Sequence, residues 1–127
     1  MPLSVTIEEK EKGAYRVIPD GSLDSNTYTI LEEKLAPVLA TGPKSIVFDM
    51  SEISYISSLG LNTILKTKKE LEALGATLIL TKLQPQVKKV FDIVAALPSM
   101  NVFESIEEAD AYLSKMQEDE IKKRKPK

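Results

Sequence analysis

Two adjacent serines, Ser57 and Ser58, stand where the sequence changes from a strand pattern to a helix pattern. Before them, residues 45–48 form a short apolar run rich in β-branched and aromatic side chains, which predicts a buried strand. After them, apolar side chains recur at helical spacing. The members of this helical stripe are Leu61, Ile64, Leu65, Leu71 and Leu74. The two hydroxyls are therefore expected at the beginning of a helix.

A hydroxyl at the start of a helix has two uses. Serine is a favoured N-cap, because its oxygen accepts a hydrogen bond from a free amide of the first turn, and this contributes about 1 kcal/mol. The same place carries the positive end of the helix dipole and several unpaired N–H groups, so it also tolerates a phosphate. Ser57 and Ser58 are thus either structural caps or acceptors of a regulatory phosphoryl group, and their position alone leaves both open.

The composition excludes several classes of function. The chain has 127 residues and a net charge of −2, which fits one domain and gives no reason to expect nucleic-acid binding. It contains no histidine, which removes the commonest general base and a Ser/His/Asp triad, and no cysteine, which removes thiolate metal sites. The glycine-rich loops that bind nucleotide phosphates are missing as well. We therefore expect neither an enzyme nor a bound cofactor or metal.

The elements that position the serines can be placed along the first half of the chain. Two strands, at 5–8 and 15–18, are separated by a polar turn and predict a hairpin. Residues 19–22 are expected to end the second strand, since proline cannot continue a central ladder. A helical stripe follows over residues 28–39, and Pro37 within it is expected to kink or end the helix, at a cost of about 3 kcal/mol.

The second half of the chain alternates strand and helix. Residues 77–81 predict a strand, and Gln84-Pro85 opens a helix, because proline is tolerated at an early helical position. Residues 102–103 are a candidate edge strand, and residues 105–108 match a capping box before a last helix. The charged residues 118–127 predict a disordered, basic tail. No signal-peptide pattern and no long apolar run is present, so we expect a cytoplasmic protein without stable membrane insertion.

This order of elements predicts an α/β fold. Strands that alternate with helices form a mixed, mainly parallel sheet of four to five strands, packed with about four helices through right-handed crossovers. Partners of such sheets gather at the carboxyl ends of the strands. Asp24, Asp49 and Ser58 each follow a predicted strand, so they are expected at one rim. At Asp24 a helix cap and a catalytic or magnesium-binding role both remain open.

Four segments of the chain resemble the STAS domain family, and within it the stand-alone anti-sigma factor antagonists of bacteria. The segments are Gly21-Ser22-Leu23-Asp24, Ser45-Ile46-Val47-Phe48-Asp49 with the run from Tyr55 to Leu61, the run from Gly75 to Leu80, and the run from Pro85 to Phe91. The resemblance extends over residues 5–116. It implies a single STAS domain at 1–117, followed by the tail.

The resemblance also implies which residues carry function. The phosphoacceptor of the family is the first serine after an aspartate, and in an alignment through Gly60-Leu61 that position holds Ser58. Ser57 occupies the position of the aspartate and is the alternative acceptor, while Asp24 matches the family acid near the acceptor. The implied partner-binding surface consists of Asp24, Ser57, Ser58, Leu59, Gly60 and Asn62.

The implied function is that of a phosphoprotein in transcription regulation. The unphosphorylated protein would sequester an anti-sigma factor that is also a serine protein kinase, and phosphorylation at Ser58 would release it. A serine phosphatase of the PP2C type would reverse the step, and the protein would be a monomer or weak dimer. The alternative is a STAS scaffold, or a subunit of a lipid or anion transport system, in which the serines are not phosphorylated. Burial of Ser58 beneath neighbouring residues, out of reach of another protein, would rule out the switch and leave only the predicted architecture.

Overall fold

The computed structural model describes residues 3–96 and 105–124 of the chain. The chain begins with an antiparallel hairpin of β1 (Ser4–Glu11) and β2 (Ala14–Leu23). Gly13 turns the chain between these strands with a φ of 84°, a conformation that glycine adopts at little steric cost. The predicted hairpin is confirmed.

β2 pairs with three other strands and is the centre of the sheet. Its first half pairs in parallel with β3 (Ser45–Asp49), which in turn pairs in parallel with β5 (Thr77–Thr81). Its last residues pair in parallel with β4 (Ile53–Ile56), which lies off the main path β1-β2-β3-β5. The sheet is five-stranded and mixed, so the predicted α/β fold is confirmed.

β2 continues to Leu23, and the expectation that it ends at Pro19 is wrong. Pairing with β3 stops at Val17, and pairing with β4 begins at Gly21. Pro19 lies in the gap between these two ladders, where its missing N–H leaves no partner on β3 or β4 unpaired. The longer β2 carries the chain directly to the place where α2 begins.

Residues 53–56, expected as part of a connection, form β4 instead. Ile53 and Ile56 are buried in the core, while Ser54 between them is exposed. A strand of four residues next to a serine-rich run has too little alternation to stand out from a loop. Its pairing partner is the end of β2, which the sequence also placed outside the strand.

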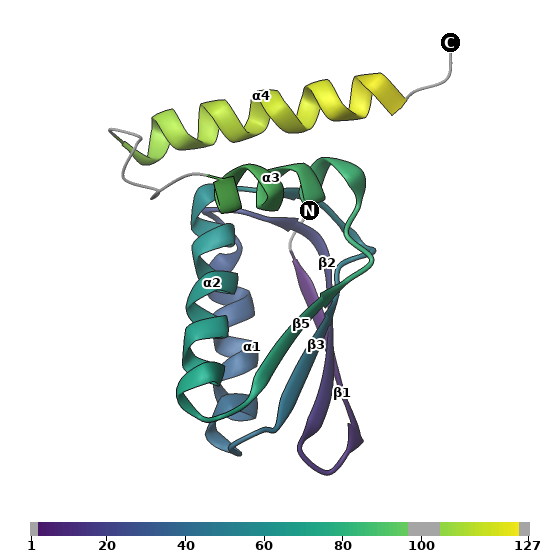
Figure 1. Ribbon diagram of the computed structural model, residues 1–127, viewed down its shortest axis with the longest axis vertical. Helices are drawn as coiled ribbons and strands as arrows, with labels where there is room; N and C mark the ends of the chain where they lie inside the picture. Colours follow the sequence, from purple (N-terminus) through teal and green to yellow (C-terminus); the bar gives the residue numbers. More distant parts are fainter. Residues whose placement is uncertain (1–2, 97–104, 125–127) are drawn as a thin grey trace.

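α1 (Tyr28–Ala40) and α2 (Ser58–Ala73) lie beside each other on one face of the sheet (Figure 1). The core between these helices and the strands includes Val17, Leu23, Leu31, Leu35, Ile46, Phe48, Ile53, Ile56, Leu61, Ile64 and Leu71. Ile56 and Leu61, which flank the two serines, are both fully buried. The hydrophobic core therefore fixes the position of the serines from both sides.

α1 continues through Pro37 to Ala40, so the helix does not end at the proline. Of the two predicted outcomes, a kink or an end, the end is wrong. Leu35 and Val38 next to the proline are buried, while Pro37 itself is exposed. Thr41 holds the end of the helix, because its backbone N–H and its hydroxyl both donate to the carbonyl of Val38, at 3.1 and 2.6 Å. Packing on both sides of Pro37 and the cap at the C-terminal end of α1 thus offset the hydrogen bond that proline cannot donate.

α3 (Pro85–Ala96) and α4 (Ile106–Arg124) are the other two helices of the described residues. α4 packs on α3 and lies across the end of the molecule at which α2 begins (Figure 1). The serine of the predicted capping box is in use, since the hydroxyl of Ser105 accepts from the N–H of Glu108 at 3.0 Å. The candidate edge strand at 102–103 lies outside the described residues.

The described part of the predicted tail is helical. α4 continues without a break through residues 118–124, so the prediction of disorder is wrong there. A Lys115–Asp119 ion pair at 3.1 Å joins the two parts one turn apart, and Lys122 and Lys123 near the end suit the negative pole of the helix dipole. The division of the chain into a domain at 1–117 and a tail stays a prediction.

Candidate partner-binding site

The site begins where β4 passes into α2. The N–H of Ser57 donates to the carbonyl of Leu23, the last residue of β2, at 2.9 Å. The hydroxyl of Ser57 accepts from the N–H of Gly60 at 3.2 Å and so caps α2. Ser57 is only 2% exposed. Of the two uses that the sequence leaves open for this pair of serines, Ser57 takes the structural one in this arrangement.

Gly60 brings the first turn of α2 into contact with the backbone of β2. A Cβ atom at this position would lie 2.4 Å from the carbonyl oxygen of Leu23 and 2.9 Å from its carbonyl carbon. No side chain fits at that distance without a shift of the backbone. Glycine is therefore required for the close approach, independently of any role in binding.

Ser58 is the first residue of α2, and its polar groups face α4. Its N–H and its hydroxyl both donate to Oδ1 of Asp110, each at 2.8 Å. A carboxylate in this place is stabilised by the free amide and by the positive end of the helix dipole. Ser58 is 3% exposed, so the expectation of an accessible hydroxyl at the rim is wrong while α4 is in place.

Other polar side chains of α4 extend the contact with the site. The side-chain oxygen of Gln117 accepts from the N–H of Ile56 at 3.0 Å, and its amide nitrogen donates to the carbonyls of Ile56 and Leu113, at 2.8 and 3.1 Å. The hydroxyls of Tyr55 and Ser114 are 2.6 Å apart. Ile56 is thus bonded as if it were paired with a further strand, although its partner is a side chain.

Asp24 lies in the turn between β2 and α1. Its carboxylate accepts from the N–H of Asn26 at 2.9 Å and from the hydroxyl of Thr27 at 3.2 Å. Its carbonyl accepts from the N–H of Thr27 and of Tyr28, at 3.2 and 2.9 Å. Asp24 therefore organises the entry into α1, directly after Leu23, whose carbonyl binds Ser57.

Asp49 belongs to a different polar network. Oδ1 accepts from the backbone N–H and the hydroxyl of Ser51, at 3.0 and 2.7 Å, while Oδ2 bonds to the guanidinium of Arg16 and lies 3.7 Å from Nζ of Lys82. These bonds, those from Ser51 above all, hold the pKa of Asp49 well below its ordinary value, although its burial acts in the opposite direction. Because side chains alternate along β3, Asp49 points away from the face that Ile46 and Phe48 bury, so it has a structural role in the sheet.

The residues predicted to contact a partner differ in exposure. Asn62 is exposed, Asp24 and Leu59 are half-buried, and Ser57, Ser58 and Gly60 are buried. The fold brings the end of β2 and the beginning of α2 together, as the motifs predict. Of the buried members, Ser58 bonds to Asp110 of α4, so a partner can reach its hydroxyl only if α4 moves, whereas Gly60 lies against Leu23 of β2.

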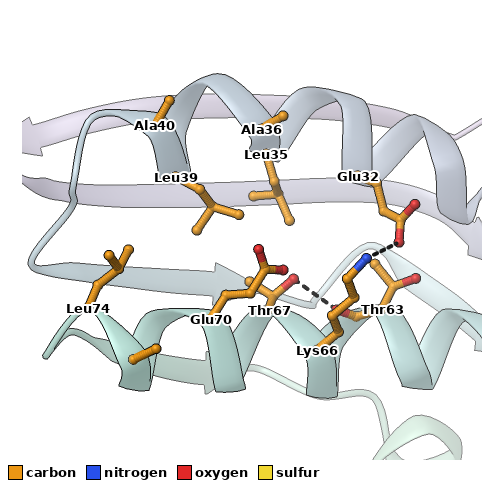
Figure 2. A pocket seen from close by; sticks show the side chains of 11 residues that line it. Glu32, Leu35, Ala36, Leu39, Ala40, Thr63, Lys66, Thr67, Glu70 and Leu74 are labelled. Atoms are coloured by element: carbon orange, nitrogen blue, oxygen red, sulfur yellow. Dashed lines mark hydrogen bonds and ion pairs between the residues drawn. The ribbon is translucent and has the colours of Figure 1, made fainter.

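A groove of about 560 Å³ lies between α1 and α2, and its lining does not include the two serines (Figure 2). Glu32 and Lys66 form an ion pair across it at 3.8 Å. The hydroxyls of Thr63 and Thr67 donate to carbonyls of α2, at 3.0 and 2.8 Å. These polar groups already bond within the protein.

Residues 3–96 and 105–124 contain neither a candidate metal cluster nor a candidate membrane-spanning helix. In that part of the chain no three His, Cys, Asp or Glu side chains come together so that they could hold a metal ion. None of its helices combines the length and the apolar character that crossing a bilayer requires.

A family model matches the part of the chain that contains the two serines. The model of the STAS domain matches residues 7–109, which include β2, both serines and Gly60. The chain belongs to the STAS domain family. The resemblance inferred from the sequence motifs is confirmed, and the match ends one residue before Asp110.

Relatives of this STAS chain include anti-sigma factor antagonists. A putative anti-sigma factor antagonist of Bordetella bronchiseptica, BtrV, is 35% identical over 91 residues, which cover 72% of this chain and 78% of the relative. The anti-sigma-B factor antagonist of Staphylococcus aureus is 29% identical over 107 residues, which cover 84% of this chain and 98% of the relative.

Solved structures share the STAS fold of this chain. The anti-sigma factor antagonist SpoIIAA in its unphosphorylated form has a TM-score of 0.61 and 23% identity, with 71% of this chain and 83% of that chain covered. A murine Solute Carrier 26 anion transporter has a TM-score of 0.58 and 18% identity, with 86% of this chain but 20% of the transporter covered. These likenesses show the fold alone.

Asp110 and Gln117 are two of the residues around the site that the sequence motifs did not indicate, and Ser114 is a third. Asp110 and Gln117 lie 52 and 61 residues from their partners Ser58 and Ile56, so no local motif joins them. One signal was present: Asp110 and Gln117 fall on the same helical face as Leu113, three and four residues away. Polar side chains on the apolar stripe of a helix indicate a buried polar contact.

Proposed function

We propose that this STAS protein is an anti-sigma factor antagonist that works as a phosphorylation-regulated binding module. Unphosphorylated, it would sequester an anti-sigma factor that is also a serine kinase, in the cytoplasm where sigma factors act. Phosphorylation at Ser58 would release that partner. The observation that carries the proposal is the place of Ser58 at the first position of α2, where its N–H already binds a carboxylate.

Relatives support the general role. Two similar proteins bear the name of anti-sigma factor antagonist, and binding rather than catalysis is what that name describes. SpoIIAA, which shares the fold, has been solved in a phosphorylated form. The role of Ser58 in this chain is our own extension of that likeness.

Phosphoryl transfer would need little from the antagonist itself. Oγ of Ser58 would form a bond to the γ-phosphorus of ATP held by the kinase, while the bond to the departing ADP breaks. The hydroxyl proton would pass to a base of the kinase. The antagonist is then a substrate of its partner and needs no cofactor of its own.

The added phosphate would oppose binding rather than folding. It brings a charge of about −1.5 to −2 to the positive end of α2, which tolerates an anion. The same charge and bulk would lie in the interface, where any acidic group of the partner would repel it. A loss of about 3 kcal/mol is enough to weaken binding more than a hundredfold.

Phosphate mapping tests the proposal directly. The protein is incubated with ATP and each serine-kinase anti-sigma factor of the same organism, and mass spectrometry then locates the phosphate. We expect modification of the wild type and of Ser57→Ala, and none of Ser58→Ala. Absence of phosphate at Ser58 with every such kinase would overturn the proposal, and modification of Ser57 alone would move the switch to the alternative acceptor.

The burial of the serines favours a second function. If Ser57 and Ser58 serve only as a cap and as a seat for Asp110, the protein is a constitutive STAS scaffold or a subunit of a lipid or anion transport system. The transporter structure with the same fold fits this alternative. Under it, Ser58→Ala would slightly lower stability, and partner binding would not respond to kinase and ATP.

A further inference from the structure

We propose that α4 is a detachable cover of the Ser57–Ser58 site, and that a partner which presents a carboxylate binds by taking its place. The covering face of α4 consists of Asp110, Ser114 and Gln117, each of which bonds to the end of β4 or the first residue of α2. The identity of the partner rests on the proposed function, whereas the release of α4 does not.

α4 is attached to the Ser57–Ser58 site by polar bonds, and it also packs on α3. Asp110 and Gln117 make four hydrogen bonds to Ser58 and Ile56, all of which water or another protein could replace. Fewer apolar side chains are buried on α4 than on α2: Ala109 and Leu113 on α4, against Leu61, Ile64 and Leu71 on α2. Ile106 and Ile121 of α4 are 49% and 38% exposed. Apolar burial is the main source of binding energy between elements, so α4 is held less firmly than α2.

The covered surface is suited to a carboxylate. The N–H and the hydroxyl of Ser58 converge on one oxygen of Asp110, at the positive end of α2. A carboxylate from another protein can accept the same two hydrogen bonds once Asp110 leaves. The release of Gln117 frees the N–H and the carbonyl of Ile56 in the same step, and a side-chain amide or a strand edge can pair with them.

The cover reconciles a buried Ser58 with its use as an acceptor. A kinase must reach Oγ, which α4 now blocks, so phosphorylation requires the open form. In the closed form a phosphate on Ser58 would lie against the carboxylate of Asp110, and the two negative charges would repel each other. Phosphorylation and opening therefore favour each other. The family match ends before all three covering residues, which makes the cover a feature to be tested in this chain itself.

A unique thiol at the covered position tests the release of α4 without any partner or kinase. The chain contains no cysteine, so Ser58→Cys places one reactive group beneath α4. Its alkylation by iodoacetamide, a neutral reagent, is followed by mass spectrometry. The reference is Asn62→Cys, an exposed position one turn further along α2. We expect the thiol at 58 to react at least about tenfold more slowly than the thiol at 62, since only open molecules react.

Gln117→Ala in the Ser58→Cys protein is the decisive variant. It removes two hydrogen bonds to Ile56 without touching residue 58, so it does not alter the acidity of the thiol directly. We expect the alkylation rate to rise about tenfold or more. Glu118→Ala, an exposed neighbour on the same helix, is the matched control and should leave the rate within about twofold.

Three results would overturn the cover. The first is that the thiol at 58 reacts as fast as the thiol at 62 in every variant. The second is that Gln117→Ala leaves the alkylation rate of a protected thiol at 58 unchanged. The third is that this thiol reacts only at the rate of global unfolding measured in urea. If Ser58→Cys does not fold, amide hydrogen exchange of Gln117→Ala with Ser58 intact decides. Faster exchange in α4 with unchanged exchange in β2 and β3 supports the cover, and equal exchange in wild type and variant overturns it.

Discussion

Gly60 shows how closely the sheet and α2 approach each other. Gly60→Ala would place a Cβ atom 2.4 Å from the carbonyl oxygen of Leu23, so backbone has to move. We expect the free energy of unfolding to fall by about 1–3 kcal/mol, the usual range for overpacking. Urea unfolding at neutral pH measures the loss. Asn62→Ala, an exposed position on the same helix, should change stability by less than about 0.5 kcal/mol. Equal effects of the two substitutions would show that the contact is not tight.

Asp49 gives the protein a stability that depends on pH. In the folded state, the bonds from Ser51 and Arg16 lower the pKa of Asp49 below the ordinary value of about 3.9 that the unfolded chain has. The unfolded state therefore binds the proton first as pH falls. The contribution is fully present above that value and is lost as the pH drops towards the folded pKa.

Asp49→Asn should remove this contribution. We expect the free energy of unfolding to fall by about 1.5–3 kcal/mol at neutral pH, the usual range for hydrogen bonds to a charged group. The difference from wild type should shrink below about pH 4, which urea unfolding at several pH values measures. Asp92→Asn breaks an exposed ion pair with Lys88 and should cost less than about 1 kcal/mol. A difference that persists unchanged in acid would contradict the role of the charge.

At the residue scale, contacts between residues close in the sequence could be predicted, and contacts between distant residues could not. The cap by Ser57 follows from a serine before an apolar helical stripe, and it could be predicted. The carboxylate on Ser58 could not, because Asp110 comes from a helix 52 residues away. Asp24 follows β2 as predicted, whereas Asp49 is the last residue of β3 rather than the residue after it. Which polar network each joins depends on neighbouring strands and turns.

At the element scale, α1 offers a direct test of how much its proline costs. Pro37→Ala restores the N–H that bonds to the preceding turn, and the exposed position loses no buried surface. We expect the free energy of unfolding to rise by about 1–3 kcal/mol, less the entropy that proline removes from the unfolded chain. Urea unfolding measures the change. A variant less stable than wild type would show that proline favours this helix rather than strains it.

Elements with strong periodicity were predictable, and those defined by pairing were not. The hairpin, the strand at 77–81 and the helices follow from the alternation of apolar and polar residues. β4 and the last residues of β2 exist because they pair with each other, across a connection that contains a whole helix and strand. Residues 118–124 continue the helix, and the Lys115–Asp119 ion pair one turn apart adds a small stabilisation that a reading of net charge overlooks.

At the scale of the whole molecule, a negative charge at residue 58 should loosen α4 and leave the sheet intact. Ser58→Glu would place a second carboxylate against Asp110. We expect amide exchange in α4 to become at least about tenfold faster, with no change in β2 and β3. Hydrogen exchange followed by mass spectrometry measures both regions in one experiment.

Two further variants give the controls. Ser58→Glu with Asp110→Asn removes one of the two charges, so the acceleration in α4 should become smaller. Glu107→Gln makes the same kind of change at an exposed position of α4 and should not reduce it. Protection of α4 that is the same in wild type and Ser58→Glu would contradict the coupling.

The close contact of Gly60 with Leu23 has a consequence for how a signal can spread. On one side of the serines, the end of β2 and the start of α2 pack closely. Their backbones are in contact at Gly60, and the N–H of Ser57 bonds to the carbonyl of Leu23. On the other side of the serines, α4 is bonded through side chains that another protein could replace. A change at Ser58 is therefore expected to affect the position of α4. The contact between β2 and α2 should be the same in both states of the protein.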